Sequence, residues 1–406
     1  MGFLIKKCFR FLLPAAILAC IAALIRYPGE VSAAVIESLG VCFRVIIPAL
    51  FPFFVFASLL IETGGARQLG TVFGFLMRPV FNVPKSCCLA FFLGILSGYP
   101  VGANTAISLY QSGYCTKTEA ERLLSFCNNS GPAFVLGSVG IGIWKDFRLG
   151  VLLYVCHIAA CVCTGFLFRF YKYGDRSRVP ASRGSGSTAR GLSGALTKSV
   201  RSSTDNLIYV IAFIVFFAVV TKLLTLSGVI PAVAAFFARV FSPAGLDAAF
   251  FENLLGGLLE VTAGVRGAGA LTASAASRLA LTAGILGWAG ISVHCQVLSF
   301  LSESDLSSLP YIGGKAVQSV LASVFTYVAL FFYPFEISVG KTLQSGVESI
   351  LSVGFSDILL LSCALLIPAG IAWGIAAIVP RRQKSGLSKR AVLRYTKQEE
   401  HLGRTP

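Results

Sequence analysis

Long apolar runs, separated by short polar interruptions, follow one another along most of the chain. Runs of about 18 or more apolar residues are typical of membrane-spanning helices, whereas the strands of a membrane barrel would alternate polar and apolar positions. The pattern predicts an all-α polytopic membrane protein with about eight transmembrane helices. The clearest runs are Leu149–Phe168, Leu207–Val220, Ala316–Phe332 and Ile358–Val379.

Two polar interruptions fall inside apolar segments of the first half. They read SGYPVGAN, from Ser97 to Asn104, and FCNNSGPAF, from Phe126 to Phe134. Proline removes a backbone donor and glycine weakens a helix, so neither stretch suits a regular helix. In hydrocarbon, broken helices persist only where they line a cavity within the protein. We therefore expect Ser86–Ser112 to form a re-entrant hairpin and both breaks to line a substrate site at membrane depth.

These two breaks supply most of the candidate substrate-binding residues. Free N–H groups at the N-termini of half-helices attract anions, and the neighbouring amides add donors and acceptors. The alternative is that the amides only satisfy backbone groups freed by the breaks. The candidates are Ser97, Gly98, Tyr99, Pro100, Gly102, Asn104, Asn128, Asn129, Ser130 and Gly131.

The second half contains a similar hairpin, expected over Ala249–Thr272 and broken within TAGVRGAG, Thr262–Gly269. Three further candidates lie here, namely Glu260, Thr262 and Arg266. Ionisable residues at membrane depth tend to be functional, and the planar fork of arginine suits a carboxylate ligand. The alternative is a salt bridge between Glu260 and Arg266 that stabilises the hairpin. Glu260 is also a candidate carrier of a coupling proton.

Composition supports the membrane assignment: 55% of the 406 residues are hydrophobic and 13% are charged. The net charge of +16 comes from three segments, with three basic residues before the first span, eight within 169–201 and eight within 381–404, less three acidic residues. Positive charge confined to extramembrane segments indicates cytoplasmic loops that meet anionic lipid, and nucleic-acid binding is not expected. The cysteines lack metal-binding spacing and read as packing residues.

The two halves follow the same plan. Gly64 matches Gly228, and Gly102-Ala103 matches Gly267-Ala268, at nearly the same offset. Counting spans from a cytoplasmic N-terminus inverts the second half, so the two hairpins oppose each other, as in many secondary transporters. The expected divisions are an anchor helix (1–30), a first inverted repeat (31–170), a basic Gly/Ser/Arg linker (171–203), a second repeat (204–334), an extra span (335–380) and a basic tail (381–406).

The remaining polar residues carry less information. His157 and His294 are expected to be hydrogen-bonded packing residues, and Arg122 and Arg278 to extend from helix ends toward the interface. No Walker motif, HExxH or nucleophile–base pair occurs, so we expect neither an enzyme nor a cofactor. A coupling ion, H⁺ or Na⁺, is left open, and an oligomer is compatible with the sequence.

SGYPVGA, TKTEAERLLSFCNNSGPAF and the downstream VGIG resemble the sporulation integral membrane protein family called YlbJ or SpoVV, which contains the nucleoside-recognition Gate domain. The resemblance covers roughly Phe43 to Trp373. It implies a fold similar to concentrative nucleoside transporters, and transport of dipicolinic acid across the outer forespore membrane. Transport of a nucleoside or other small solute, and a non-transporting sporulation scaffold, are the alternatives.

Our first prediction concerns topology: the segment Arg169–Arg201 and the tail after Arg381 both lie in the cytoplasm, because together they hold sixteen basic residues. Accessibility of introduced cysteines to an impermeant reagent, in intact and in opened cells, measures this. If the two segments lie on opposite sides of the membrane, the inverted repeat is wrong.

Overall fold

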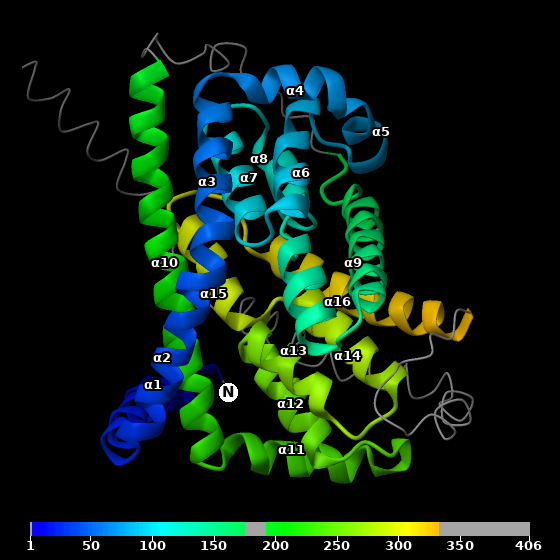
Figure 1. Cartoon of the computed structure of the whole chain (residues 1–406). Helices are drawn as coiled ribbons and strands as arrows, with labels where there is room; N and C mark the ends of the chain where they lie inside the picture. Colours follow the sequence, from blue (N-terminus) through cyan, green and yellow to red (C-terminus); the bar gives the residue numbers. More distant parts are fainter. Residues whose placement is uncertain (1, 175–191, 333–406) are drawn as a thin grey trace, which may run out of the picture. The chain divides into compact units, whose positions relative to one another are not determined.

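The computed structural model describes residues 2–174 and 192–332, and over these residues it contains helices and no strand (Figure 1). Contacts group the chain into two units, residues 1–369 and 370–406, and every described residue belongs to the first. The expected extra span and basic tail lie outside the described residues, as does most of the linker.

The elements before the linker are α1 (Gly2–Arg26), α2 (Pro28–Val41), η1 (Cys42–Ile46), α3 (Ile47–Glu62), α4 (Gly65–Phe73), η2 (Gly74–Leu76), α5 (Met77–Phe81), η3 (Lys85–Cys87), α6 (Cys88–Leu96), α7 (Val101–Gln111), α8 (Lys117–Leu124), η4 (Ala133–Ile143) and α9 (Phe147–Phe168). Those after it are α10 (Leu192–Leu226), α11 (Val229–Val240), η5 (Ser242–Ala244), α12 (Ala248–Leu259), α13 (Val261–Ala270), α14 (Ala275–Trp288), α15 (Gly290–Leu301) and α16 (Leu309–Phe332).

The predicted helical membrane architecture is confirmed. Within the described residues, four segments are long and apolar enough to span a membrane: α9, α10, α14 with α15, and α16. Two bent pairs raise the number to six when each is counted as one span, and they bend by 96° and 106°. Because one expected span lies outside the described residues, the total of about eight stays a prediction.

Both helical hairpins are present. Helix α6 packs against α7, and α12 packs against α13. The first hairpin breaks at Ser97–Pro100, so that α7 begins at Val101 and includes Gly102 and Asn104. The second breaks at Glu260, and TAGVRGAG is helical, contrary to our expectation. The break shifts because Glu260 adopts an extended backbone and its carboxylate caps the helix that follows.

Glycines bring the first hairpin into contact with the second polar interruption. A Cβ added to Gly94 or to Gly102 would lie 1.8 or 1.9 Å from the carbonyl oxygen of Cys127. Such distances are far below van der Waals contact, so only glycine fits at these two positions. The hairpin therefore lies directly against the chain around residue 127.

The two halves repeat a local conformation. Gly64 precedes α4 with φ +78°, and Gly228 precedes α11 with φ +79°. Both are left-handed conformations that favour glycine, and both follow an apolar helix. This agreement supports the predicted repeat, although the domain boundaries themselves remain predictions.

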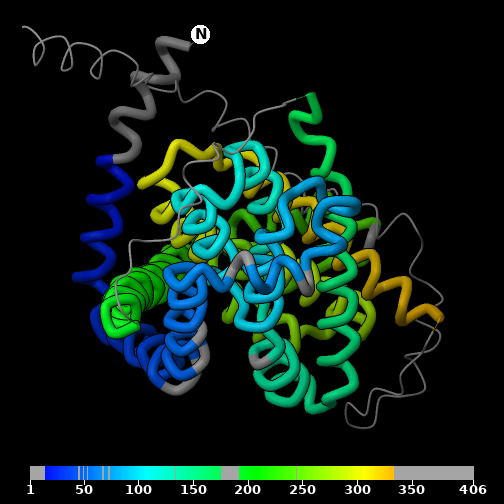
Figure 2. Tube along the Cα trace, turned by 90° about the horizontal axis from the view of Figure 1, so that it is seen from above, coloured from blue at the N-terminus to red at the C-terminus, as the bar shows by residue number. Residues whose placement is uncertain are grey.

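Helix α10 begins earlier than the expected end of the linker. It starts at Leu192, and Ala195, Ser199 and Ser203 are buried at intervals of four residues. This spacing gives one continuous packed face, which explains why a stretch of small and basic residues is helical. Helix α10 packs against α2 and α3, and Figure 2 shows α10 nearly end-on beside them.

The loop between α15 and α16 joins the two halves. The Asp305 carboxylate accepts hydrogen bonds from the Tyr110 hydroxyl at 2.7 Å and the Lys117 ammonium at 2.9 Å. These bonds hold the pKa of Asp305 below its ordinary value, the Tyr110 bond having the larger effect. The buried Glu121 carboxylate accepts the Ser307 N–H at 2.9 Å.

We predict that Gly102→Ala destabilises the folded protein by about 1–3 kcal/mol, because a methyl group there meets a backbone carbonyl that cannot turn aside. The matched control is Gly256→Ala in α12, where nothing lies within 4 Å of the added carbon. Thermal unfolding in detergent compares the two variants. Equal melting temperatures would contradict the close packing of hairpin and chain.

Candidate functional site

The helix breaks of both halves meet around one cavity of about 80 Å³. The first half contributes Ser97–Tyr99 and Ser130–Gly131, and the second contributes Glu260–Thr262 together with Ser292, Val293 and Gln296 from α15. Helices α3 and α10 complete the wall with apolar side chains. Seven of the thirteen candidates from the sequence line this cavity: Ser97, Gly98, Tyr99, Ser130, Gly131, Glu260 and Thr262.

Within each half, the hairpin break touches the break in the helix that follows. A Cβ on Gly98 would lie 2.7 Å from the Gly131 nitrogen. In the second half, a Cβ on Gly290 would lie 3.1 Å from both the Leu259 oxygen and the Val261 nitrogen. Glycine therefore permits two broken segments to meet without side chains between them, and the cavity lies where the two pairs converge.

Glu260 supplies the capping group of the second hairpin. Its carboxylate accepts hydrogen bonds from the N–H groups of Thr262 at 2.9 Å and Ala263 at 2.7 Å. A negative charge at a helix N-terminus is favourable, and it satisfies two donors that would otherwise be free in the membrane. Because the protein's own carboxylate already caps this N-terminus, a substrate anion would have to bind elsewhere in the site.

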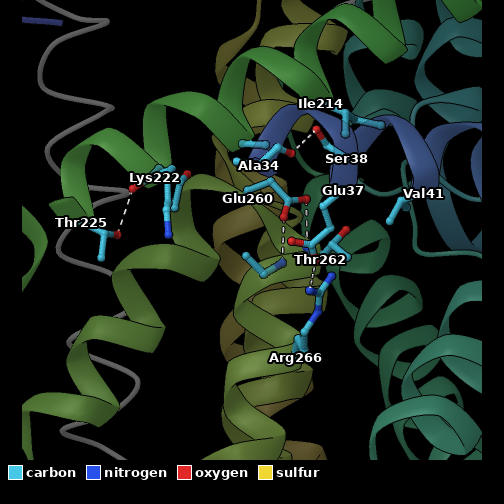
Figure 3. Close-up of a pocket in the computed structure, with 13 residues that line it drawn as sticks. Ala34, Glu37, Ser38, Val41, Ile214, Lys222, Thr225, Glu260, Thr262 and Arg266 are labelled. Carbon is cyan, nitrogen blue, oxygen red and sulfur yellow. Dashed lines mark hydrogen bonds and ion pairs between the residues drawn. The ribbon is translucent and has the colours of Figure 1, made fainter. Parts of the chain in front are cut away.

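A second pocket, of about 320 Å³, adjoins the first and shares Ile214, Glu260 and Thr262 with it. Figure 3 shows its wall, formed by α2, α10 and α13. Arg266 lines this pocket and forms an ion pair with Glu37 of α2, not with Glu260. The salt bridge considered from the sequence is therefore absent, because the Glu260 carboxylate is held by the N-terminus of its own helix.

Lys222 of α10 is a second cation in this pocket, and the sequence analysis did not identify it. It is partly buried, and the ion pairs found among the described residues do not include it. In the sequence, Lys222 is a single lysine near the end of an apolar run, and most such lysines extend to the membrane interface. What distinguishes Lys222 is that α2 and α13 lie beside it, which only the tertiary structure shows.

Asn128 and Asn129 do not line either pocket, although both are fully buried. Asn129 donates to the Phe126 carbonyl at 3.0 Å and accepts from the Gln318 amide at 2.7 Å. Asn128 donates to the Tyr311 hydroxyl at 3.3 Å. These contacts favour the alternative role, in which the amides hold the break. Pro100, Gly102 and Asn104 also lie outside the two pockets.

Lys315 of α16 is the most unexpected residue near the site. Its side chain is fully buried, and its ammonium donates to the Asn128 carbonyl at 2.8 Å and to the Gln318 side-chain oxygen at 2.9 Å. His157 accepts the N–H of Ser130 at 3.1 Å. The break at residues 128–130 is thus held by α9 and α16. In the sequence, Lys315 directly precedes the predicted span at Ala316, where it resembles a flanking residue.

The remaining polar residues also form hydrogen bonds. His157 and His294 are buried and hydrogen-bonded, as predicted. Arg122 and Arg278 donate instead to backbone carbonyls, Arg122 to those of Asn82, Tyr171 and Lys172, and Arg278 to those of Ala268 and Gly269. The two arginines therefore cap the ends of helices, and their extension to the interface stays a prediction.

Comparisons with known proteins bear on the family resemblance and on the membrane location. Residues 43–171 match the Gate family, described as nucleoside recognition. Over 373 residues the chain is 28% identical to the sporulation integral membrane protein YlbJ of Bacillus subtilis (strain 168), covering 88% of this chain and 91% of that protein. The predicted resemblance is confirmed. The chain is an integral membrane protein.

Two solved structures of CNTnw, a concentrative nucleoside transporter, are also similar. An inward-facing, substrate-bound state is 14% identical with a TM-score of 0.46, covering 80% of this chain and 85% of that one. An outward-facing state is 15% identical with a TM-score of 0.42, covering 81% and 86%.

We predict that Glu260→Ala destabilises the protein by about 1 kcal/mol through loss of the cap, whereas Arg266→Ala costs about 0–1 kcal/mol because its ion pair is more than half exposed. The double variant should show the sum of the two effects, since the side chains do not pair. Thermal unfolding of the four proteins tests this. If the double variant is more stable than Glu260→Ala or Arg266→Ala alone, the two side chains do pair, and the salt-bridge hypothesis holds.

Proposed function

We propose that this protein transports a small anionic metabolite across a membrane, with dipicolinate as its substrate during sporulation. The observation that carries the proposal is the convergence of helix breaks from both halves on one cavity. Breaking four helical segments inside the membrane is costly unless the freed backbone groups and the space between them are used. A scaffold protein has no need of such a cavity.

The pocket that adjoins the cavity supports an anionic substrate. Its volume of about 320 Å³ lies at the lower end for small-molecule sites. Arg266 and Lys222 both line it, from helices α13 and α10. Arginine binds a carboxylate through two parallel hydrogen bonds, while lysine acts as a point charge. A dicarboxylate can engage both cations once its own carboxylate replaces that of Glu37, whose side chain is 60% exposed.

The similarity of this chain to a sporulation protein supports a role in spore-forming cells. What is known of that family supports dipicolinate as the substrate and the outer forespore membrane as the location. The Gate family's description favours a second candidate, a nucleoside. The two cations of the larger pocket favour dipicolinate over a nucleoside, because a neutral nucleoside has no anionic group for them to bind. Uptake of one and not the other therefore decides between the candidates.

Our fourth prediction is that liposomes containing the purified protein take up labelled dipicolinate faster than empty liposomes. Arg266→Lys keeps the charge but loses the paired hydrogen bonds, and Lys222→Met removes the second cation. Each should lower apparent affinity about tenfold or more, as expected for a lost charged hydrogen bond of about 1.5–3 kcal/mol. The control is Arg239→Lys on α11, which lies outside both pockets.

If the liposomes take up nucleosides but not dipicolinate, a nucleoside is the substrate. If they take up neither, a scaffold role is favoured. If dipicolinate is transported and both pocket variants match the control, the larger pocket is not its binding site.

A further inference from the structure

In its ammonium form, Lys315 would carry a charge that no carboxylate among the described residues balances. Its side chain is fully buried in the middle of the described helices, and both its hydrogen-bond acceptors are neutral. Ion pairs found among the described residues leave it out. An ammonium removed from water without a counter-charge costs several kcal/mol. A glutamine could donate to the same carbonyl without burying a charge, so the titratable amine calls for another explanation.

The surroundings of Lys315 hold polar groups whose hydrogen-bonding capacity is not used. Buried polar atoms are nearly always paired, yet His157 Nδ1, His294 Nε2, Asn128 Oδ1 and Ser130 Oγ have no partner within the described part of the chain. His294 and Asn128 both bond the Tyr311 hydroxyl, and His157 lies 3.3 Å from the Gln318 amide that neighbours Lys315. Together they form a polar cluster within the helical core.

The titratable groups that face this cluster come from several elements. Helix α14 packs closely on α16. There the hydroxyls of Ser319 and Ser323, both on α16, donate to backbone carbonyls of α14. On the α8 side, Glu121 is already bonded to Lys172 and to the Ser307 N–H. The others are Cys127 before the break, His157 and Cys161 of α9, His294 of α15 and Tyr311 of α16 itself. All are neutral, or paired elsewhere.

The cluster is connected to the cavity through very few bonds. Lys315 donates to the carbonyl of Asn128, and Ser130 and Gly131, two and three residues further, line the cavity. An anion that enters the cavity region therefore acts on Lys315 through protein rather than water. Charges interact strongly in such a medium, so the anion favours the ammonium form and the ammonium favours binding of the anion.

We propose that Lys315 binds the proton that accompanies an anionic substrate, an inference that rests on the proposed transport function. When the anion binds, a hydronium ion gives up one proton to the lone pair of the Lys315 amine and becomes water, and when the anion leaves the proton returns to water. No other bond is made or broken. By linkage, the proton strengthens binding of the anion by the same factor as the anion strengthens binding of the proton.

The test uses the full-length protein in detergent with a panel of small carboxylates, namely dipicolinate, benzoate, phthalate, succinate and acetate. Melting temperatures are recorded against concentration at several pH values between about 6 and 9. Proton uptake is followed separately with an indicator dye in weak buffer as each carboxylate is added. The proteins are the wild type, Lys315→Met, Lys315→Arg, and the control Lys198→Met, whose lysine lies on α10 and pairs with Glu62.

For the wild type and Lys198→Met, we expect affinity for the bound carboxylate to rise up to about tenfold per unit fall in pH, with about one proton taken up per anion. Lys315→Met should bind weakly without pH dependence. Lys315→Arg is charged at every pH, so it should bind without pH dependence and without proton uptake. The dye measurement on the wild type stays informative if a variant does not fold.

Each outcome decides. Binding with no proton uptake, or a pH dependence that persists in both Lys315 variants, overturns the inference and leaves the transport function standing. If another carboxylate of the panel binds with Lys315-dependent proton uptake and dipicolinate does not bind, the inference is supported and dipicolinate is excluded as the substrate. If no carboxylate of the panel binds at any pH, both the inference and the anion-transport function fail.

Discussion

Every helix that breaks inside a membrane leaves backbone donors and acceptors without partners, and the described structure is arranged around that constraint. The break at Glu260 is satisfied by the carboxylate of the same residue. The break at residues 128–130 is satisfied from outside, by Lys315, Gln318 and His157. The two solutions differ in consequence. The first leaves a fixed negative charge beside the cavity, and the second leaves a buried amine behind it.

Both groups bear on what the proposed site can bind. Glu260 occupies the N-terminus of α13, so under the proposed function a substrate anion would bind away from it, at Arg266 and Lys222. Glu37 and Glu260 line the same pocket as Arg266 and Lys222, so its acidic and basic residues are equal in number. An anion that displaces Glu37 from Arg266 brings negative charge into the protein, which is the condition under which a proton on Lys315 becomes favourable.

Much of this architecture could be predicted from the sequence because glycine and proline mark broken helices in apolar segments. The breaks at Ser97–Pro100 and near Gly131 were found in this way. The same rule placed the second hairpin's break too late, at Thr262–Gly269. The glycines there allow close packing instead, since a Cβ on Gly264 would lie 2.2 Å from the Cα of Gly257. A glutamate that ends one helix and caps the next, as Glu260 does, has no sequence pattern as clear as a glycine or proline.

The chemistry of the site was less predictable, since single polar residues gain their meaning from neighbours far along the chain. Asn128 and Asn129 were correctly placed at a break but contact α16, 183 to 189 positions away in the chain. Lys315 and Lys222 each stand alone beside an apolar run, where most lysines extend to the interface. Only packing of α16 against α8 and α9, and of α10 against α2, shows that these two are enclosed.

The central claim, that a solute binds where the breaks of both halves meet, is tested most directly at Thr262, which lines both cavities. In a Thr262→Cys variant, site-resolved mass spectrometry measures the rate at which a small thiol reagent modifies residue 262. The native thiol of Cys163, exposed on α9, provides the internal reference. The account predicts that saturating dipicolinate slows modification at position 262 and leaves that of Cys163 unchanged. Equal rates at position 262 with and without dipicolinate would contradict it.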